Sequence, residues 1–311
     1  MALLHRLIVL IPLILSIVGT ILSALSLFAG HKQGFMEDYA IARLNVSRIG
    51  YDVIKSSSSN NSSNSDDDGG FLDSLKDKWN DVKQDVTEKI NDVVGDVAGD
   101  VAESIGISEW YSIHVMNACE GDYSPNSTVS GASLNITNCT TSEAGFHLNM
   151  TALMDKELGV GPFDINIADL GWDEKMQEKL DIVNKVLLGL FVLYVLGIGF
   201  SGLATILCVA AFLLPENRLV AVGNLLLALL ATIVLIIASI LITVTVTKGV
   251  SEFNNLSEKI GVTIVRGNPF LIISWVAAVV MLVAMVFWAT RFHMIRKQDR
   301  LGPRYVSRSK I

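Results

Sequence analysis

Charged side chains are scarce in this chain of 311 residues, and they are unevenly distributed along the sequence. Asp, Glu, Lys and Arg make up 18% of the residues, whereas hydrophobic residues make up 51%. Three long stretches contain no charged residue: Val186 to Leu214, Leu219 to Thr247 and Pro269 to Thr290. Such runs exclude an ordinary soluble domain and predict membrane-spanning helices, because only a helix pairs its own backbone groups in lipid.

A fourth apolar run, Leu7 to Ala29, is either a retained span or a secretory signal peptide. Its length exceeds the roughly 7 to 15 residues of a signal core, which favours a retained span. The small residues at Ala24 to Ser26 nevertheless offer a passable cleavage site. Under either interpretation, residue 30 onward is exported.

The sequence also lacks the patterns of catalysis and transport. It has no Ser-His-Asp order, no HExxH and no paired catalytic carboxylates in a defensible context, so we predict no enzyme, no cofactor and no nucleic-acid partner. His114 and His147 have no Cys or carboxylate at metal-ligand spacing, which predicts no metal site. The spans carry no ionisable groups of the kind that line ion paths, which disfavours a channel or transporter.

Charge predicts the orientation of the chain. Residues 291–311 hold seven basic residues and one acidic residue, whereas residues 30–183 hold 27 acidic and 11 basic residues. Because basic segments stay on the cytoplasmic side, the tail is expected inside and segment 30–183 outside. Eight candidate glycosylation sequons all fall on the expected outer side: Asn45, Asn60, Asn61, Asn126, Asn135, Asn138, Asn149 and Asn255.

These features predict a multi-pass, mainly α-helical membrane protein with both termini cytoplasmic. The expected segments are a cytoplasmic N-terminus 1–6, spans 7–29, 184–214, 219–247 and 269–290, exterior loops 30–183 and 248–268, a cytoplasmic turn 215–218 and a basic tail 291–311.

The first exterior loop divides by composition. Residues 56–70 are a polar, low-complexity stretch that predicts a disordered linker. Residues 71–105 carry apolar positions in an eleven-residue repeat, which predicts an amphipathic helix. Its apolar stripe fits packing on its own exterior domain, contact with the outer membrane surface, or pairing with a partner's helix.

Residues 107–150 predict a disulfide-containing β module. Trp110 and Tyr111 begin an alternating apolar and polar stretch, and segment 34–54 carries a similar signal for one or two strands. Cys119 and Cys139 are the only cysteines outside the spans, so one pairing is possible, worth about 3 kcal/mol by loop closure. Alternation at Ile260, Val262 and Ile264 predicts a strand that can extend the same sheet.

Gly197, Ser201 and Thr205 form a small-xxx-small pattern within one span. Small residues at this spacing let membrane helices approach closely, and we expect these three to lie at helix contacts.

Four segments carry a resemblance to a known family: YAIARLNVSRIG after the first span, GISEWYSIHVMNACEG followed by Cys139, AGFHLNM, and GNPFLIISW entering the last span. In their order around four spans they resemble the claudin-type architecture, and more closely the fungal Sur-seven/PalI family, over about two-thirds of the chain. The resemblance implies a claudin-like four-helix bundle with a small extracellular antiparallel sheet, to which the amphipathic helix 71–105 is an addition. Trp110 and Cys119 stand farther apart than in vertebrate claudins, and the tail is shorter than in many PalI-type proteins.

The same resemblance implies a non-enzymatic organiser of fungal cortical membrane compartments of the eisosome type, affecting wall integrity, endocytosis or lipid domains. Expected partners are anionic inner-leaflet lipids at the basic tail, further copies of the chain or other cortical membrane proteins, and the cell wall. The alternatives are an accessory of ambient-pH signalling, or a regulator of cell fusion or calcium influx.

Overall fold

The computed structural model describes residues 2–47, 107–125, 127, 129, 131–149, 174–214, 217–257 and 262–306. The chain forms two compact units. The helical unit comprises Met1–Ala29, Gly189–Thr243 and Asn268–Ile311, and the sheet unit comprises Gly30–Leu188 and Val244–Gly267. The linker expected at 56–70 and the amphipathic helix expected at 71–105 lie outside the described residues.

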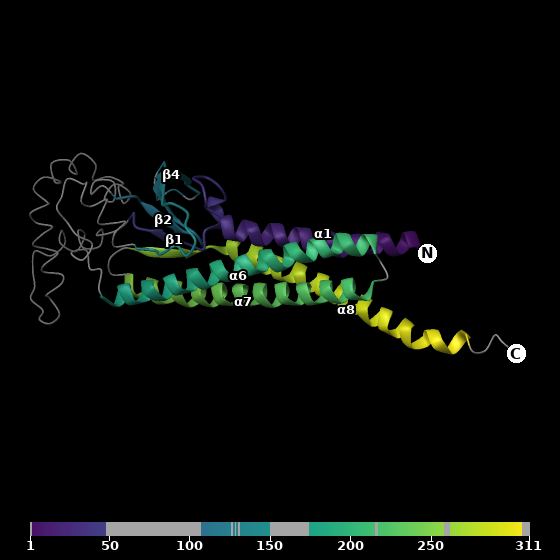
Figure 1. Ribbon diagram of the computed structural model, residues 1–311. Coiled ribbons are helices and arrows are strands. Elements are labelled where there is room, and N and C mark those ends of the chain that lie inside the picture. The colour runs from purple at the N-terminus through teal and green to yellow at the C-terminus, as the bar shows by residue number, and fades with distance from the viewer. Residues whose placement is uncertain are drawn as a thin grey trace, which may run out of the picture. The chain divides into compact units, whose positions relative to one another are not determined.

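Four long helices contain the charge-free runs (Figure 1). They are α1 (Ala2–Phe28), α6 (Glu174–Leu213), α7 (Arg218–Ser257) and α8 (Asn268–Val306). Each contains a segment long and apolar enough to cross a membrane: Ile8–Phe28, Leu180–Leu213, Arg218–Asn254 and Asn268–Lys297. The predicted fold class, four candidate spans with a small antiparallel sheet, is confirmed.

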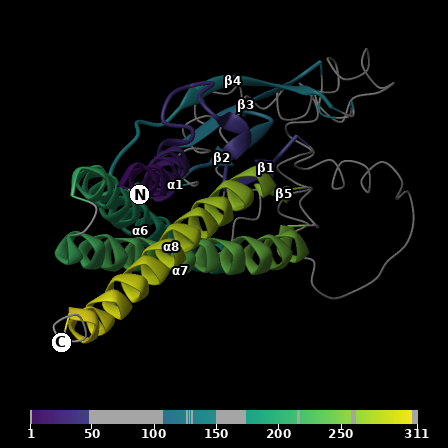
Figure 2. The same ribbon diagram turned by 90° about the vertical axis from the view of Figure 1, so that its right-hand side faces the viewer.

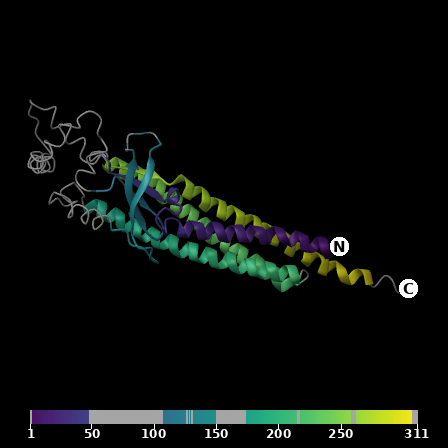
Figure 3. The same cartoon turned by 90° about the horizontal axis from the view of Figure 1, so that it is seen from above.

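Small side chains fill the interior of the helical unit. Ala231 and Ala238 on α7 and Ala277 on α8 are fully buried, whereas Ile206 on α6 and Val279 on α8 are more than half exposed. This distribution suits a lipid environment, where apolar side chains face the acyl chains and small residues let helices approach. α1 packs along α8 (Figure 3), and the beginning of α1 and the end of α8 lie at the same end of the helical unit (Figure 1).

All four helices extend beyond the expected spans; α1 begins at Ala2, inside the expected N-terminus 1–6. α6 begins at Glu174, ten residues before the expected span 184–214. α7 continues to Ser257, so the first part of the expected loop 248–268 is helical, and α8 continues to Val306, through most of the expected tail 291–311. A charge-free run marks the apolar part of a helix, but polar residues with good helix propensity prolong the helix past it.

A five-stranded antiparallel sheet is the centre of the sheet unit. Its strands are β1 (Ala42–Asn45), β2 (Trp110–Ile113), β3 (Ala118–Ser124), β4 (Ser133–Cys139) and β5 (Thr263–Arg266). Their spatial order is β4-β3-β2-β1-β5 (Figure 2). β5, from the second expected loop, pairs with β1, which confirms the predicted extension of the sheet.

Two strand boundaries differ from those expected. Segment 34–54 contributes only β1 among its described residues, preceded by the short 3₁₀ helix η1 (Glu37–Tyr39). The strand predicted from Ile260, Val262 and Ile264 begins later, at Thr263. Its register is set by pairing with β1 and by a hydrogen bond from the Gly267 amide to the Ile41 carbonyl, neither of which a local pattern contains.

Candidate functional site

The strand β2 carries the largest side chains of the sheet core. Trp110 and Tyr111 are at most 1% exposed. Trp110 pairs with Gly121 on β3, where an added Cβ would lie 2.6 Å from Cζ2 of the indole and against the Asn135 carbonyl. The Arg43 guanidinium lies 5.5 Å from the centre of the indole ring, a cation–π distance. The structure therefore places Trp110 and Tyr111 in the packing of the sheet.

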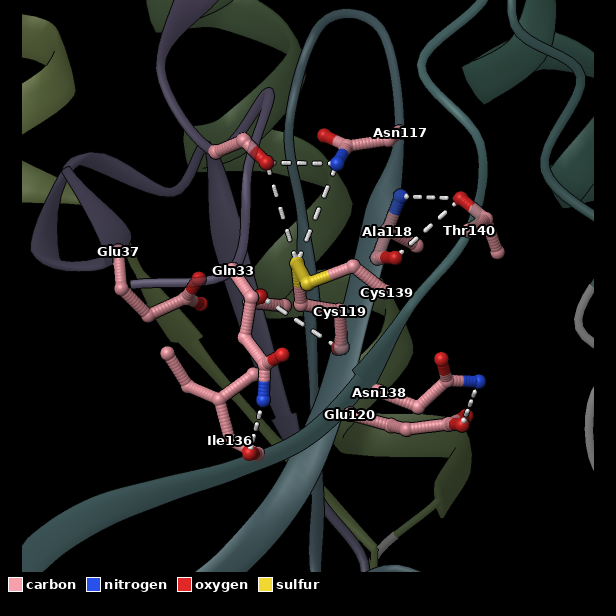
Figure 4. Close-up of a disulfide and its surroundings, with 12 residues drawn as sticks. Gln33, Glu37, Asn117, Ala118, Cys119, Glu120, Ile136, Asn138, Cys139 and Thr140 are labelled. Carbon is pink, nitrogen blue, oxygen red and sulfur yellow. Dashed lines mark hydrogen bonds between the residues drawn. A yellow bond between two sulfur atoms is a disulfide. The ribbon is translucent and has the colours of Figure 1, made fainter. Parts of the chain in front are cut away.

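The predicted disulfide is present between Cys119 on β3 and Cys139 on β4 (Figure 4). The two cysteines are directly paired in the sheet register. Next to the bridge, the Thr140 amide donates to the Ala118 carbonyl at 2.8 Å, and the Ala118 amide donates to Thr140 Oγ1 at 3.0 Å. The bridge and these hydrogen bonds hold the edge strand β4 to the rest of the sheet.

A buried acid–base pair lies beside the bridge. His114, directly after β2, is fully buried, and Glu37 of η1 is 8% exposed. His114 Nε2 lies 3.4 Å from Glu37 Oε1 and 3.3 Å from Ser112 Oγ. Burial opposes a charge on Glu37, but hydrogen bonds from His114 and Ser112 and the charges of His114 and Arg43 outweigh it, so the pKa of Glu37 lies below its ordinary value.

The segment that follows α1 covers this pair. Gly30 has φ of +75°, and a Cβ there would collide with the His114 ring, so glycine is required on both counts. The Gly30 carbonyl accepts a 2.6 Å hydrogen bond from Asn117 Nδ2, and the His31 carbonyl accepts one from Ser142 Oγ at 3.0 Å. These contacts join the segment to the loop after β2 and to the chain after β4.

Glu37, His114 and Cys119 form a group of potential metal ligands. One ligand atom of each lies within 4.8 Å of the other two, and all three residues are buried. The sequence missed this group because Glu37 and His114 stand 77 positions apart and meet only through the sheet. Cys119 is committed to the bridge in this structure and has no thiolate to offer.

The candidate sequons differ in their exposure. Asn135 and Asn138 on β4 and Asn149 after it are exposed. Asn45 is half-buried in β1, where its Oδ1 accepts hydrogen bonds from the amide and the hydroxyl of Ser47. Asn255 lies in the last turn of α7, and the remaining sequons are outside the described residues: Asn60, Asn61 and Asn126.

Gly197 and Ser201 of the small-residue pattern contact other helices, whereas the hydrogen bond of Thr205 lies within α6. A Cβ at Gly197 would lie 2.7 Å from Leu235 on α7. Ser201 is fully buried and its Oγ accepts a 3.0 Å hydrogen bond from Thr20 on α1, while Thr205 Oγ1 donates to the Ser201 carbonyl.

A second polar contact joins three helices, and no sequence pattern predicted it. Tyr194 Oη of α6 donates to Ser274 Oγ of α8 at 2.8 Å, and Ser239 Oγ of α7 lies 2.8 Å from the same oxygen. The three side chains are at most 1% exposed, so their hydroxyls are satisfied by one another inside the bundle.

A family model described as the SUR7/PalI family matches residues 8–287, nearly the whole chain. The chain belongs to the SUR7/PalI family. This agrees with the four helices and the small antiparallel sheet. Comparison with curated proteins gave no significant match, and neither did comparison with solved structures.

Membership of the SUR7/PalI family covers both units, because the matched residues include most of α1, the sheet strands and about half of α8. The chain is therefore a multi-pass membrane protein of this family, and the disulfide-linked sheet lies within the region that defines it.

Proposed function

We propose that this protein is a non-enzymatic organiser of the plasma membrane, acting in cortical membrane compartments of the eisosome type. The observation that carries the proposal is membership of the SUR7/PalI family over residues 8–287. The interior of the sheet unit supports it, because its side chains are used for packing: Trp110, Tyr111, Val46 and Leu148 are at most 1% exposed. A rigid, bridged module of this kind suits binding to other macromolecules rather than turnover of a substrate.

We propose that the sheet unit faces the exterior and that both termini are cytoplasmic. The net charge of +6 in residues 291–311 supports this orientation, as do the exposed sequons Asn135 and Asn138. α8 continues past its charge-free run, which ends at Thr290, and this continuation carries Arg291, Arg296 and Lys297. Basic residues near an anionic leaflet contribute about 1 kcal/mol each, so this extension is the proposed lipid contact.

The proposed partners of the exterior module are further copies of the chain, other cortical membrane proteins and the cell wall. Its acidic composition and exposed sequons support a hydrated outer surface.

The test is the distribution of a fluorescent fusion in living cells. Static patches at the cell cortex that persist over minutes are expected. A protein that diffuses evenly through the plasma membrane, or that stays on internal membranes, would contradict the proposal. A chain carrying Cys119→Ser, which lacks the bridge, should reach the surface less well or lose the patches.

A second candidate, an accessory role in ambient-pH signalling, is favoured by one observation. Glu37 and His114 form a buried carboxylate–imidazole contact in the sheet unit, with 3.4 Å between Oε1 and Nε2. A deletion strain that fails to grow only in alkaline medium, while other cortical marker proteins still form patches, would favour this role over the organiser. A defect confined to fusing cells would favour the third alternative, regulation of cell fusion or calcium influx.

A further inference from the structure

Three side chains of different ligand chemistry meet beside the bridge. Glu37 comes from η1, His114 from the end of β2 and Cys119 from β3, and their ligand atoms lie within 4.8 Å of one another. Figure 4 shows Glu37 to the left of the Cys119–Cys139 bridge. A carboxylate, an imidazole and a sulfur are the donor types that hold zinc in proteins.

Hydrogen bonding in this group is incomplete. Glu37 Oε2, His114 Nδ1 and Asn117 Oδ1 are buried and have no hydrogen-bond partner among the described residues. The contacts that His114 Nε2 does make, at 3.3 and 3.4 Å, are longer than the usual 2.7–3.2 Å of a hydrogen bond to nitrogen. Buried polar groups are normally satisfied, so this arrangement has capacity for a further bound species.

The spacing of the nitrogen and the oxygen fits a tetrahedral cation. Two ligands bound at about 2.0–2.1 Å to a tetrahedral zinc ion lie about 3.3 Å apart. His114 Nε2 and Glu37 Oε1 are 3.4 Å apart. The Cys119 sulfur lies within 4.8 Å of a ring nitrogen of His114 and of a carboxylate oxygen of Glu37, and a shift of about 1 Å would bring it to the distance expected of a third ligand.

The bridge controls whether the sulfur can bind. A disulfide sulfur has no thiolate, and it is the thiolate that binds metals. We propose that reduction of the Cys119–Cys139 bridge converts this group into a binding site for a thiophilic divalent cation of the zinc type, held by Glu37, His114 and Cys119. Cys139, the bridge partner of Cys119 on β4, is the fourth ligand within reach.

The chemistry balances with a thiol as reductant. Two thiol molecules, R–SH, break the sulfur–sulfur bond, give one cysteine thiol at each position and leave as R–S–S–R. The cation then displaces the proton of each thiol that it binds, and these protons pass to solvent. Asn117 Nδ2, 3.9 Å from the Cys119 sulfur, is placed to donate a hydrogen bond to the thiolate. The bridge and the bound cation are therefore alternative states of one site.

Donor type selects the class of cation. Sulfur and imidazole ligands favour zinc and its neighbours in the first transition row, whereas magnesium and calcium require oxygen ligands. Co²⁺ is a suitable probe, because tetrahedral cobalt–thiolate sites absorb strongly through sulfur-to-metal charge transfer.

The primary test uses the full-length protein in detergent, before and after reduction with a phosphine. The reduced protein should bind one Co²⁺ per chain with a charge-transfer band, Zn²⁺ should displace it, and the oxidised protein should show neither effect. Equal binding in both redox states would overturn the proposal, as would no binding by the reduced protein.

Two variants, each lacking one cysteine of the bridge, give a matched comparison. Cys139→Ser and Cys119→Ser both lose the bridge, so any loss of stability is shared. Only Cys139→Ser keeps the proposed thiolate beside His114, and it should bind Co²⁺ without reductant, whereas Cys119→Ser should bind at least tenfold more weakly. Equal affinities in the two variants would contradict the assignment of Cys119 as a ligand.

Two further variants complete the test. Glu37→Gln in the reduced protein should weaken binding by at least tenfold, and unchanged affinity would exclude the carboxylate from the site. Cys208→Ser removes the free cysteine of the helical unit and should leave binding unchanged; loss of the cobalt band in this variant would move the site away from the bridge.

Discussion

At the residue scale, the charge of Glu37 has a consequence for the stability of the sheet unit. Its pKa is lowered in the folded protein because His114, Ser112 and Arg43 together overcome the cost of burial. A carboxylate of this kind stabilises the fold when the pH is above its unfolded-state pKa, and the stabilisation is lost as the pH falls through the lower folded-state pKa. The sheet unit should therefore lose stability below about pH 4.5, the ordinary carboxyl value.

Glu37→Gln removes this dependence. We expect the variant to be less stable at pH 7 by about 1–3 kcal/mol, because His114 loses its charged partner. Its stability should change less than that of the wild type between pH 7 and pH 3. Urea unfolding of the detergent-solubilised protein, followed by tryptophan fluorescence, measures both quantities. Identical pH profiles for the two proteins would show that Glu37 carries no such linkage.

Gly121 is the second residue whose substitution has a specific expected effect on stability. Gly121→Ala would place a methyl group against the Asn135 carbonyl and the Trp110 ring, and should destabilise the sheet unit by about 1–3 kcal/mol. Gly249→Ala is the control, because no atom of the described residues outside its own helix lies within 4 Å of an added Cβ and alanine favours a helix by up to about 1 kcal/mol. Thermal unfolding should shift in opposite directions for the two variants; a shared direction would contradict the packing described for Trp110.

At the element scale, β5 depends on the end of α7. Asn254 Oδ1 accepts a 2.7 Å hydrogen bond from the Ile264 amide, and Asn254 Nδ2 donates to the Ile264 carbonyl at 3.1 Å. β1 pairs with β5 on the other side, so this one side chain satisfies the amide and the carbonyl of Ile264 at the outer edge of the sheet.

Asn254→Ala should therefore loosen β5 selectively. Loss of the two hydrogen bonds leaves the Ile264 amide unpaired, and its hydrogen exchange should become roughly tenfold faster, as expected for about 1.4 kcal/mol. Asn254→Asp keeps the acceptor and should show a smaller change. Exchange at the Tyr111 amide in β2 serves as the internal reference; acceleration there of the same size would indicate general unfolding instead.

Within the helical unit, the Tyr194–Ser274–Ser239 contact specifies how three helices meet. Tyr194→Phe keeps the ring, which packs edge-on against Phe270 with 6.2 Å between centroids, and removes only the hydroxyl. Interhelical hydrogen bonds in membranes contribute about 0.6 kcal/mol on average and at most about 1.7. Unfolding in mixed detergent micelles should show a loss in that range, and an unchanged midpoint would mean that the hydroxyls add nothing to helix association.

Sequence patterns predicted some of the helices and strands and missed others. The charge-free runs located four helices because lipid leaves the backbone no alternative, and the alternation at Tyr111 and Ile113 located β2. β3 was not predicted because its sequence, ACEGDYS, has no apolar alternation. This strand is held in place by its two neighbouring strands and by the disulfide bridge. β4 did carry a weak signal, since Leu134 and Ile136 alternate with exposed polar residues.

At the scale of the whole molecule, the long-range group of Glu37, His114 and Cys119 was beyond the reach of sequence patterns. Its members come from three elements that only the strand order brings together. The disulfide was predictable because two exterior cysteines permit one pairing, whereas nothing local marks an acid 77 residues from its histidine.

The orientation of the chain decides what each unit can contact. The helical unit places the beginning of α1 and the end of α8 at one end (Figure 1), as an even number of spans requires. The charge of the tail and the exposed sequons of β4 support an exterior sheet unit and cytoplasmic termini.

The most direct test of this account is labelling of intact cells with a membrane-impermeant maleimide, in a Cys208→Ala background. Ala144→Cys introduces a thiol at an exposed position of the sheet unit, and Lys310→Cys introduces one in the basic tail. The first variant should be labelled on intact cells, and the second only after the membrane is permeabilised. Labelling of the tail variant on intact cells, with protection of the Ala144→Cys variant, would contradict the account.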